Sequence, residues 1–159
     1  MAKVKKTNAL RQLDQKKIAY EVQTYDVSDG LIDGVSVAKK TGHDVDEIFK
    51  TLVLTDGKDA FVTIIPVAEA VDLKKVARLV GVKKLELLPL AQLTPVTGYE
   101  RGGCSPVGMK KLLPTIIDER ANDLDELVVS AGRIGMQMKL QKDALVQLTN
   151  ATIAPITKE

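Results

Sequence analysis

Two apolar runs on either side of a short turn constrain the fold of this chain more than any other feature. Residues 50–55 and 60–66 both have the pattern of strands, and they flank Asp56-Gly57-Lys58-Asp59, which is typical of a hairpin loop. Alternate residues of a strand point to opposite faces, and in the first run both faces are mainly apolar. We therefore expect a hairpin that is buried on both sides.

Helix and strand signals follow one another along the rest of the chain. Helices are predicted where a capping residue precedes an apolar stripe, as at Thr7 and Asp72. The predicted helices or helical turns are 7–17, 36–42, 44–49, 72–81, 90–93 and 143–148, and the further strands are 20–25, 85–88, 115–118, 126–130 and 135–140. These strands are too many for a regular βαβ alternation, so the pattern predicts a mixed α/β (α+β) fold with a largely antiparallel sheet, in one domain spanning residues 1–159.

The composition excludes several classes of protein. Of the 159 residues, 45% are apolar and 28% are charged, which is typical of a globular protein, and only 3% are aromatic, so aliphatic side chains must build the core. No apolar run approaches the ~20 residues that cross a bilayer, and the N-terminus lacks the apolar segment of a secretion signal. We expect a cytoplasmic protein with no membrane partner, and a monomer by default.

Metal, disulfide and conventional nucleophilic chemistry find little support. Cys104 and His43 are the only residues of their types, so neither an internal disulfide nor a zinc-ligand set can form, and we expect no metal and no cofactor. His43 falls in a predicted turn, where a histidine is more often a surface residue than a catalytic base. An enzyme built on the Cys104 thiol is the weakest alternative, because no evident base accompanies it.

The window from Gly98 to Lys111, GYERGGCSPVGMKK, holds four of the eleven glycines. Glycines lack a Cβ, so the backbone N–H groups of Gly102 and Gly103 can approach a bound carbonyl or phosphate. A plain surface turn is the alternative interpretation. Dinucleotide and Walker signatures are absent, because GxGxxG does not occur and no Lys-Ser/Thr follows the glycines at the required spacing.

Lys50 opens the first, doubly apolar strand of the hairpin. Burying an ammonium group without partners is costly, so this side chain either reaches solvent from the strand end or lies in a polar pocket that uses its charge. Together with the glycine backbone and with hydroxyls such as Tyr25, Ser105 and Ser130, it forms a set of groups suited to binding and polarising a carbonyl.

Local clusters of cations, rather than the net charge of +2, carry any case for a polyanionic partner. Segments 73–85 and 101–117 contain no carboxylate, and between them they hold Lys74, Lys75, Arg78, Lys83, Lys84, Arg101, Lys110 and Lys111. Solvated helix faces explain such clusters about as well.

In the order and spacing of its motifs the chain resembles the YbaK/EbsC family, free-standing relatives of the editing domain inserted in bacterial prolyl-tRNA synthetases. The resemblance covers nearly the whole chain, and members that remove cysteine mischarged onto proline tRNA are most similar. It rests on Lys6-Thr7-Asn8-Ala9, Phe49-Lys50-Thr51-Leu52, Asp72-Leu73-Lys74-Lys75 with Gly81-Val82-Lys83-Lys84, the window TGYERGGCSPVGMKK, and Val129-Ser130-Ala131-Gly132 followed by Gly135.

The resemblance implies a curved mixed sheet with helices around a small pocket, and aminoacyl-tRNA as the substrate, with prolyl-tRNA synthetase as a further partner. It implies that Lys50 holds the phosphate of the terminal nucleotide or the α-amino region, and that the N–H groups of Gly102 and Gly103 face the ester carbonyl. Tyr25 and Ser130 match pocket hydroxyls. Ser105-Pro106 matches the segment that shapes the loop.

In the cysteine-specific members the thiol of the substrate is thought to attack its own carbonyl, which would explain the missing catalytic triad. Two departures affect the choice of amino acid: Asp33 stands where relatives can carry an aromatic residue, and Gln137 where some carry an aspartate. Cys-tRNA(Pro) deacylation is therefore the leading hypothesis. The alternative is a non-catalytic module of the same fold that recognises an amino acid, a nucleotide or a protein partner.

Overall fold

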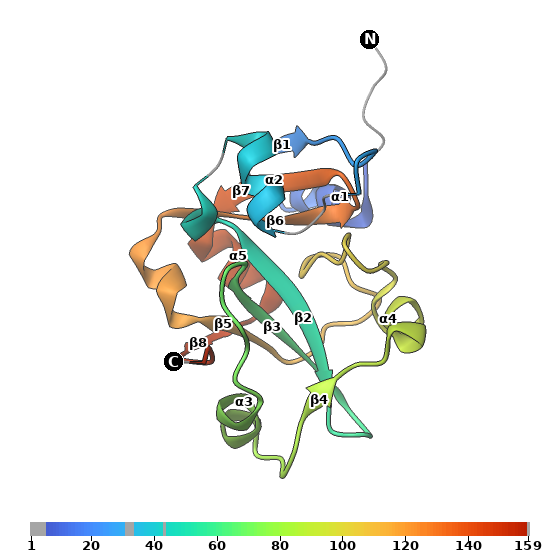
Figure 1. Cartoon of the computed structure of the whole chain (residues 1–159), viewed down its shortest axis with the longest axis vertical. Coiled ribbons are helices and arrows are strands. Elements are labelled where there is room, and N and C mark those ends of the chain that lie inside the picture. Colours follow the sequence, from blue (N-terminus) through green and yellow to red (C-terminus); the bar gives the residue numbers. More distant parts are fainter. Residues whose placement is uncertain (1–5, 31–33, 43, 159) are drawn as a thin grey trace.

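The strands divide between two sheets that pack against each other (Figure 1). The computed structural model describes residues 6–30, 34–42 and 44–158. One sheet is antiparallel, has the order β1-β7-β6, and comprises β1 (Tyr20–Thr24), β6 (Glu126–Arg133) and β7 (Met136–Gln141). The other is mixed, has the order β4-β2-β3-β5-β8, and comprises β2 (Phe49–Thr55), β3 (Ala60–Pro66), β4 (Glu86–Leu87), β5 (Thr115–Asp118) and β8 (Thr152–Ala154).

The predicted hairpin is confirmed as β2 and β3. Their antiparallel register runs from the pair Phe49–Pro66 to the pair Thr55–Ala60. In the turn, the Asp56 carboxylate accepts hydrogen bonds from the N–H groups of Lys58 and Asp59, at 2.9 and 2.7 Å. Gly57 has a φ of +98°, a conformation that glycine adopts with little strain.

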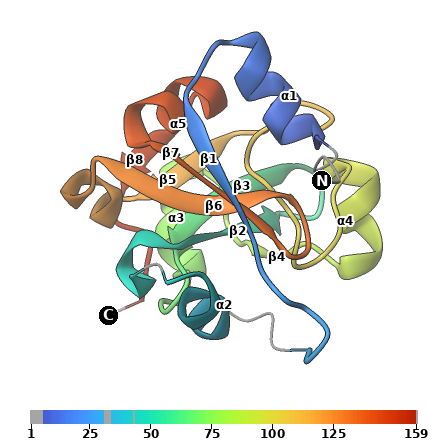
Figure 2. The same cartoon turned by 90° about the horizontal axis from the view of Figure 1, so that it is seen from above.

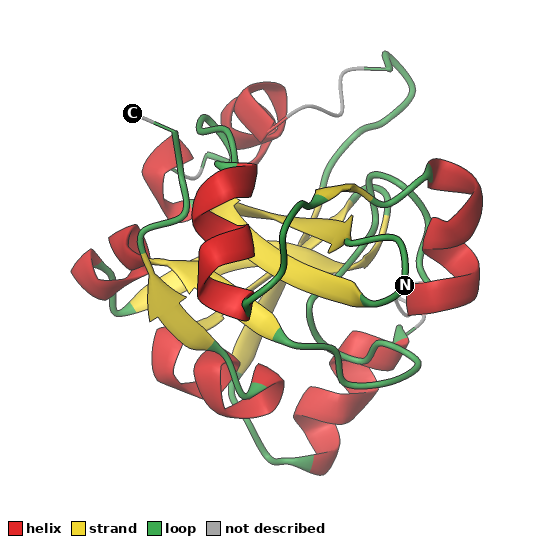
Figure 3. Ribbon diagram, turned by 90° about the horizontal axis from the view of Figure 1, so that it is seen from below, coloured by secondary structure: helices red, strands yellow, loops and turns green. Residues whose placement is uncertain are grey.

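Helices cover the sheets from several sides (Figure 3). The predicted caps are confirmed at both ends of α3, because the Asp72 carboxylate accepts from the N–H groups of Lys74 and Lys75, and Gly81 ends the helix in the left-handed region. The Thr7 hydroxyl likewise caps α1. The helical segments are α1 (Asn8–Gln15), α2 (Gly34–Thr41), η1 (Val45–Glu47), α3 (Leu73–Val80), α4 (Leu90–Thr97), η2 (Glu119–Asp123) and α5 (Lys142–Thr149).

The main core contains side chains from both sheets and from α1. The view from above shows the three-stranded sheet crossing over the strands of the other sheet (Figure 2). As the composition requires, the main core is largely aliphatic: Leu10 and Leu13 of α1 pack with Val53 of β2 and with Leu127 and Val129 of β6. Outside this core, an isolated parallel bridge between Ile48 and Val128 joins the entrance of β2 to β6. This bridge is a direct backbone link between β6 and the start of β2.

The mixed α/β class is confirmed, and the differences from expectation concern non-local features. One sheet was expected, whereas the structure has two. Strand β8 was not predicted, because its three residues become a strand only by pairing in parallel with β5.

Two elements extend beyond their predicted ends. Helix α4 continues past Pro95, and the Thr97 hydroxyl donates to the Leu93 carbonyl at 2.8 Å before Gly98 ends the helix. Strand β6 continues to Arg133 through a bulge between Ser130 and Arg133. Within the described ranges, no helix is long and apolar enough to cross a membrane.

Candidate functional site

One face of the three-stranded sheet carries a row of polar side chains. The register pairs Gln23 of β1 with Gln137 of β7, and Gln137 with Ser130 of β6. Residues paired across neighbouring strands point to the same side of a sheet, so these three side chains share one face. It is the face opposite the main core, into which Met136, Met138 and their neighbours point. We call the residues Gln23, Tyr25, Ser130 and Gln137 the polar face.

Tyr25 belongs to this face because it continues the ladder of β1. Its N–H donates to the Gly135 carbonyl at 2.9 Å, so Tyr25 lies two residues beyond Gln23 and on the same side. Its side chain is half-buried. Helix α2 adjoins the face, since the Gln23 amide donates to the Thr41 carbonyl at 2.7 Å. The structure thus brings the predicted residues Tyr25 and Ser130 to one surface.

Lys50 reaches the same region through the bridge between the sheets. Ile48 pairs in parallel with Val128, and Lys50 and Ser130 each follow two residues later in the same direction. The bridge therefore brings the start of β2, which carries Lys50, next to the part of β6 that leads to Ser130, and both side chains are half-buried. Of the two alternatives for Lys50, partial burial with a polar neighbour fits the pocket better than a side chain fully extended into solvent.

The charge of Lys50 is influenced from two directions. Burial lowers the pKa of its ammonium group below the ordinary value, and the carboxylate of Glu69 raises this pKa in part. Glu69 also forms an ion pair of 2.7 Å with Arg120. Sequence reasoning did not single out Glu69, because it approaches Lys50 only once the hairpin has formed.

Gly103 fits its place through close packing against the turn between β6 and β7. A Cβ at this position would lie 2.7 Å from the Ile134 nitrogen and 2.9 Å from the Arg133 carbonyl carbon. Its N–H donates to the Glu100 carbonyl at 3.0 Å and closes a tight turn. The prediction that both glycine N–H groups face a substrate carbonyl therefore needs correction: in this conformation the Gly103 N–H is engaged by its own loop.

Gly102 differs from Gly103 in every respect that matters for binding. It is exposed and has a φ of +83°, in the left-handed region that favours glycine. Its N–H makes no hydrogen bond to the part of the chain that the structure describes. Of the glycine pair, Gly102 is thus the residue with an N–H group available to a ligand.

Residues 104–107, which follow Gly103 in the 98–111 loop, are buried and hold the loop in place. Ser105 is fully buried and its hydroxyl accepts from the Val107 N–H at 3.2 Å, and Pro106 is buried beside it. Both residues therefore shape the loop, as the resemblance implies, and neither side chain is open to a ligand in this conformation. Cys104 belongs to the main core, and burial raises the pKa of its thiol to about 11. A thiol of this kind is a poor nucleophile near neutral pH.

Gln137 is the polar-face residue with the least satisfied side chain. It is 7% exposed, and its Oε1 atom accepts no hydrogen bond from the described residues. Together with Gln23 and Lys139 it lines a cavity of about 460 Å³. A buried carbonyl oxygen without a donor is costly, so this atom is a candidate contact for a ligand or a water molecule. The sequence marked Gln137 only as a departure from relatives.

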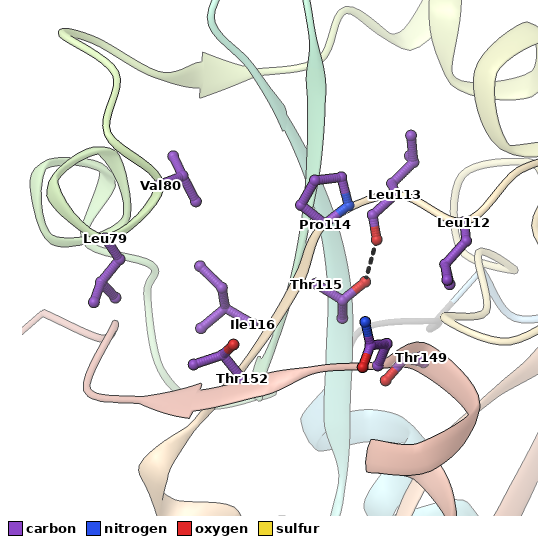
Figure 4. Close-up of a pocket in the computed structure, with 10 residues that line it drawn as sticks. Leu79, Val80, Leu112, Leu113, Pro114, Thr115, Ile116, Thr149 and Thr152 are labelled. Atoms are coloured by element: carbon purple, nitrogen blue, oxygen red, sulfur yellow. Dashed lines mark hydrogen bonds between the residues drawn. The ribbon is translucent and has the colours of Figure 1, made fainter.

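The predicted site residues do not all line one of the cavities described here. Gly103 lines a cavity of about 540 Å³ that contains neither Lys50 nor Tyr25 nor Ser130. Another, of about 430 Å³, lies between α3 and the strands β5 and β8, and its lining includes Leu79, Ile116 and Thr152 (Figure 4). Neither of these two cavities is lined by Lys50, so neither of them joins Lys50 to Gly103.

Two further points limit the chemistry of the site. Among the residues that the structure describes, no three His, Cys, Asp or Glu side chains gather as metal ligands. The predictions made for Asp33 and His43 fall outside the described residues. The candidate site therefore comprises Lys50, the neutral groups of the polar face and the turn at residues 100–103, which we call the glycine turn. Lys139 adjoins it at the cavity of Gln137.

The fold and these groups define an aminoacyl-tRNA editing domain. Residues 33–148 match the family described as "Aminoacyl-tRNA editing domain", and the chain belongs to this family. Over 161 aligned residues it is 44% identical to the Enterococcus faecalis protein named "Putative Cys-tRNA(Pro)/Cys-tRNA(Cys) deacylase EbsC", covering 99% of this chain and 98% of that protein. The recognised resemblance is thereby confirmed.

Solved structures agree with this assignment. A crystal structure described as "a putative trans-editing enzyme for prolyl tRNA synthetase" is 25% identical, with a TM-score of 0.83 and coverage of 95% of this chain and 93% of that chain. The structure of "hypothetical protein APE2540" is 19% identical, with a TM-score of 0.85 over 96% of this chain and 100% of that chain, and it supports the fold alone.

Proposed function

We propose that this protein is a trans-acting deacylase that removes cysteine from mischarged Cys-tRNA(Pro). The relative that is 44% identical carries a deacylase name that includes this substrate. The observation that carries the proposal is the Ile48–Val128 bridge, which brings the start of β2 with the half-buried Lys50 next to β6, together with the Gln137 oxygen on the polar face that has no partner among the described residues. We propose the whole chain, residues 1–159, as one deacylase domain.

Lys50 would bind the substrate rather than act as a base. Its ammonium group attracts the phosphate of the terminal nucleotide, whereas the α-ammonium group of the amino acid has the same sign of charge. Tyr25, Ser130 and Gln137 would contact the aminoacyl group with neutral donors and acceptors. The Gly102 N–H would donate to the ester oxygen as negative charge develops on it.

With this arrangement the substrate can supply its own nucleophile. The sulfur of the cysteinyl group attacks the ester carbonyl carbon, a C–S bond forms, and the C–O bond to the ribose breaks. The thiol proton is transferred to the departing ribose oxygen, so the products are a cyclic thiolactone and tRNA with a free hydroxyl group. The protein has only to hold the ester in the reactive geometry and stabilise the oxyanion.

A deacylation assay on a panel of mischarged tRNAs tests the activity. Cys-tRNA(Pro) should lose its amino acid in the presence of the protein, and Lys50→Ala should abolish most of this rate. Lys83→Ala is a matched control, because Lys83 is an exposed lysine outside the polar face. Saturable binding of the substrate without turnover would instead favour the non-catalytic module.

The nucleophile is tested by substrates of similar size that lack sulfur. If the substrate thiol attacks, Ser-tRNA(Pro) and Ala-tRNA(Pro) should be cleaved far more slowly than Cys-tRNA(Pro). Comparable rates on all three would show that water is the nucleophile, and would place the enzyme among hydrolases.

The selection of the tRNA is a separate part of the proposal. A chain with a net charge of +2 should bind the tRNA body weakly and lose this binding as salt rises. We propose that a monomer acts on tRNA(Pro) together with prolyl-tRNA synthetase. Co-purification of the two proteins, compared with and without tRNA, tests this directly.

A further inference from the structure

A cavity of about 540 Å³ lies on the side of the glycine turn where α1 begins. Three segments that are remote in sequence form it: the start of α1, the end of α4 with the following turn, and the turn between β6 and β7. Its lining residues from these segments are Lys6, Thr7, Asn8 and Arg11, then Gly98, Tyr99, Glu100 and Gly103, and then Gly132, Arg133 and Ile134. We call it the α1 cavity.

Cations outnumber anions around the α1 cavity. Among the residues that the structure describes, its lining contains the cations Lys6, Arg11 and Arg133 and one carboxylate, that of Glu100. Lys6 is ion-paired with Asp14 outside the lining, and this carboxylate offsets its charge, so Arg11 and Arg133 carry the excess of cations. The excess of positive charge therefore selects an anionic ligand.

Two further cations adjoin the rim. Arg101 is exposed and directly follows Glu100 in the chain. The side chain of Lys110 packs on Gly98, where an added Cβ would lie 3.3 Å from the lysine Cγ. Arg101 and Lys110 belong to the carboxylate-free segment 101–117, so the structure brings part of this sequence cluster to the same surface.

The lining favours recognition of phosphates over recognition of bases. Its one aromatic residue, Tyr99, is 5% exposed, and its hydroxyl donates to the Val107 carbonyl at 2.6 Å. The ring is therefore not a platform on which a base can stack. Arg11 and Arg133 are exposed, and long flexible cations of this kind suit backbone phosphates whose sequence is not read.

We propose that the α1 cavity binds the backbone phosphates of the single-stranded nucleotides that precede the terminal adenosine of the tRNA. The inference rests on the proposed function, because Gly103 lines the cavity and Gly102, which would face the ester, is its neighbour in the turn. A strand whose aminoacylated end lies at Gly102 would then pass Arg11 and Arg133, which line the cavity together with Gly103. The cavity thus holds the substrate beyond the reacting nucleotide.

A double variant, Arg11→Gln with Arg133→Gln, tests the proposal by comparing two substrates. Against cysteinyl-tRNA the KM should rise at least tenfold with kcat little changed, because contacts remote from the ester contribute mainly to binding. Against cysteinyl-adenosine, which lacks the preceding phosphates, this loss should be absent. Arg78→Gln with Lys74→Gln is the matched control, since it removes two exposed cations of α3.

Direct binding supplies a readout that is independent of catalysis. The probe is a short single-stranded RNA ending in CCA, and its affinity should decrease in the double variant but not in the control. The slope of log K against log salt should also become shallower by about 0.7 for each phosphate that the variant no longer neutralises. RNAs of the same length but different sequence should behave alike.

The outcomes separate this inference from the proposed function. Equal loss of affinity in the double variant and the control would overturn it, as would an equal rise of KM on cysteinyl-adenosine. Binding of an acidic peptide to the cavity, together with no binding of the RNA probe, would also overturn it. If the RNA binds through Arg11 and Arg133 while no ester is cleaved, the proposed deacylase activity fails and the binding site stands.

If the double variant were poorly folded, its thermal unfolding would reveal this, and Arg11→Lys would then serve as the second test. A lysine keeps the charge but loses the planar guanidinium fork, so RNA affinity should fall by a smaller factor than in Arg11→Gln. Equal affinities for RNA in wild type, Arg11→Lys and Arg11→Gln would contradict the proposal.

Discussion

The polar face and the glycine turn meet at the β6–β7 hairpin, but they position their functional groups in opposite ways. On the polar face, strand register places side chains, and the pairs Gln23–Gln137 and Gln137–Ser130 put three of them side by side. In the glycine turn, packing places the backbone, and Gly103 has no room for a side chain. We therefore expect a changed side chain on the polar face to cost less folding stability than a side chain added at Gly103.

The most severe expected effect on activity comes from Lys50→Met, which removes the charge and keeps most of the side-chain length. Deacylation of Cys-tRNA(Pro) should fall by roughly 100-fold or more, the scale on which one electrostatic contact near a reacting group typically acts. Steady-state kinetics measure this loss. Full activity in Lys50→Met would show that Lys50 does not take part in deacylation.

Lys50→Met should lose activity without losing folding stability. Because burial lowers the pKa of Lys50, the folded state binds fewer protons than the unfolded state at pH values between the lowered and the ordinary pKa. Below this window Lys50 lowers the free energy of unfolding by its full amount, and this destabilisation decreases to zero as pH rises through the window. Denaturant unfolding at neutral pH should therefore give an unchanged or higher free energy for Lys50→Met.

Gly103→Ala is the converse test, because here folding should suffer first. The added methyl group would contact backbone atoms of Arg133 and Ile134 that cannot easily move, and overpacking of this kind costs about 1–3 kcal/mol. Urea unfolding measures the cost.

Gly57→Ala is the comparison for Gly103→Ala, because the stability that it loses would come from backbone strain and not from crowding. A Cβ at Gly57 meets nothing within 4 Å, but its φ of +98° is strained for alanine. Gly103 has no such φ, so its loss of stability would come from crowding alone. A Gly103→Ala protein as stable as wild type would show that the turn yields, and the contrast between the two regions would disappear.

A smaller effect is expected from Glu69→Gln, which changes the electrostatics of Lys50 without touching it chemically. Glu69 raises the pKa of Lys50, so its removal should lower that pKa further. Lysine loses its charge as pH rises, and the alkaline limb of kcat/KM should move to lower pH. Rates must be corrected for uncatalysed ester hydrolysis.

Arg120→Gln is the control for this shift. It breaks the same ion pair with Glu69 but keeps the carboxylate charge, so it should not move the limb to lower pH. The same downward shift in both variants would show that the ion pair, rather than the charge of Glu69, matters to Lys50.

The least effect is expected from Cys104→Ala in the glycine loop. With a thiol pKa of about 11, only about one molecule in ten thousand carries the thiolate at pH 7. Deacylation should be retained, and alkylation of the wild-type thiol at pH 7 should be slow in mass spectra. Rapid, selective alkylation of Cys104 with loss of activity would revive the thiol-based alternative.

The parts of the fold that were predictable are those that depend on neighbouring residues. The hairpin turn at Asp56 and the caps at Thr7 and Asp72 are local, and all three are confirmed. Strand β8 and the division into two sheets depend on pairing between distant segments, which no short pattern of residues encodes.

The candidate site divides in the same way. Residue types and family motifs single out Lys50, Tyr25 and Ser130, but only the Ile48–Val128 bridge and the strand register bring them together. Chain geometry alone shows that the Gly103 N–H closes its own turn and that the Gln137 Oε1 atom has no donor within the described part of the chain. Their substrate contacts remain predictions for the experiments above.

The bulge between Ser130 and Arg133 makes one strand serve two surfaces. Before it, β6 presents Ser130 to the polar face; after it, Arg133 borders the α1 cavity and its backbone abuts Gly103. A graft or deletion in this hairpin would displace both surfaces at once. Chimaeras with other editing domains should therefore exchange the β6–β7 hairpin and the 98–111 loop as one block.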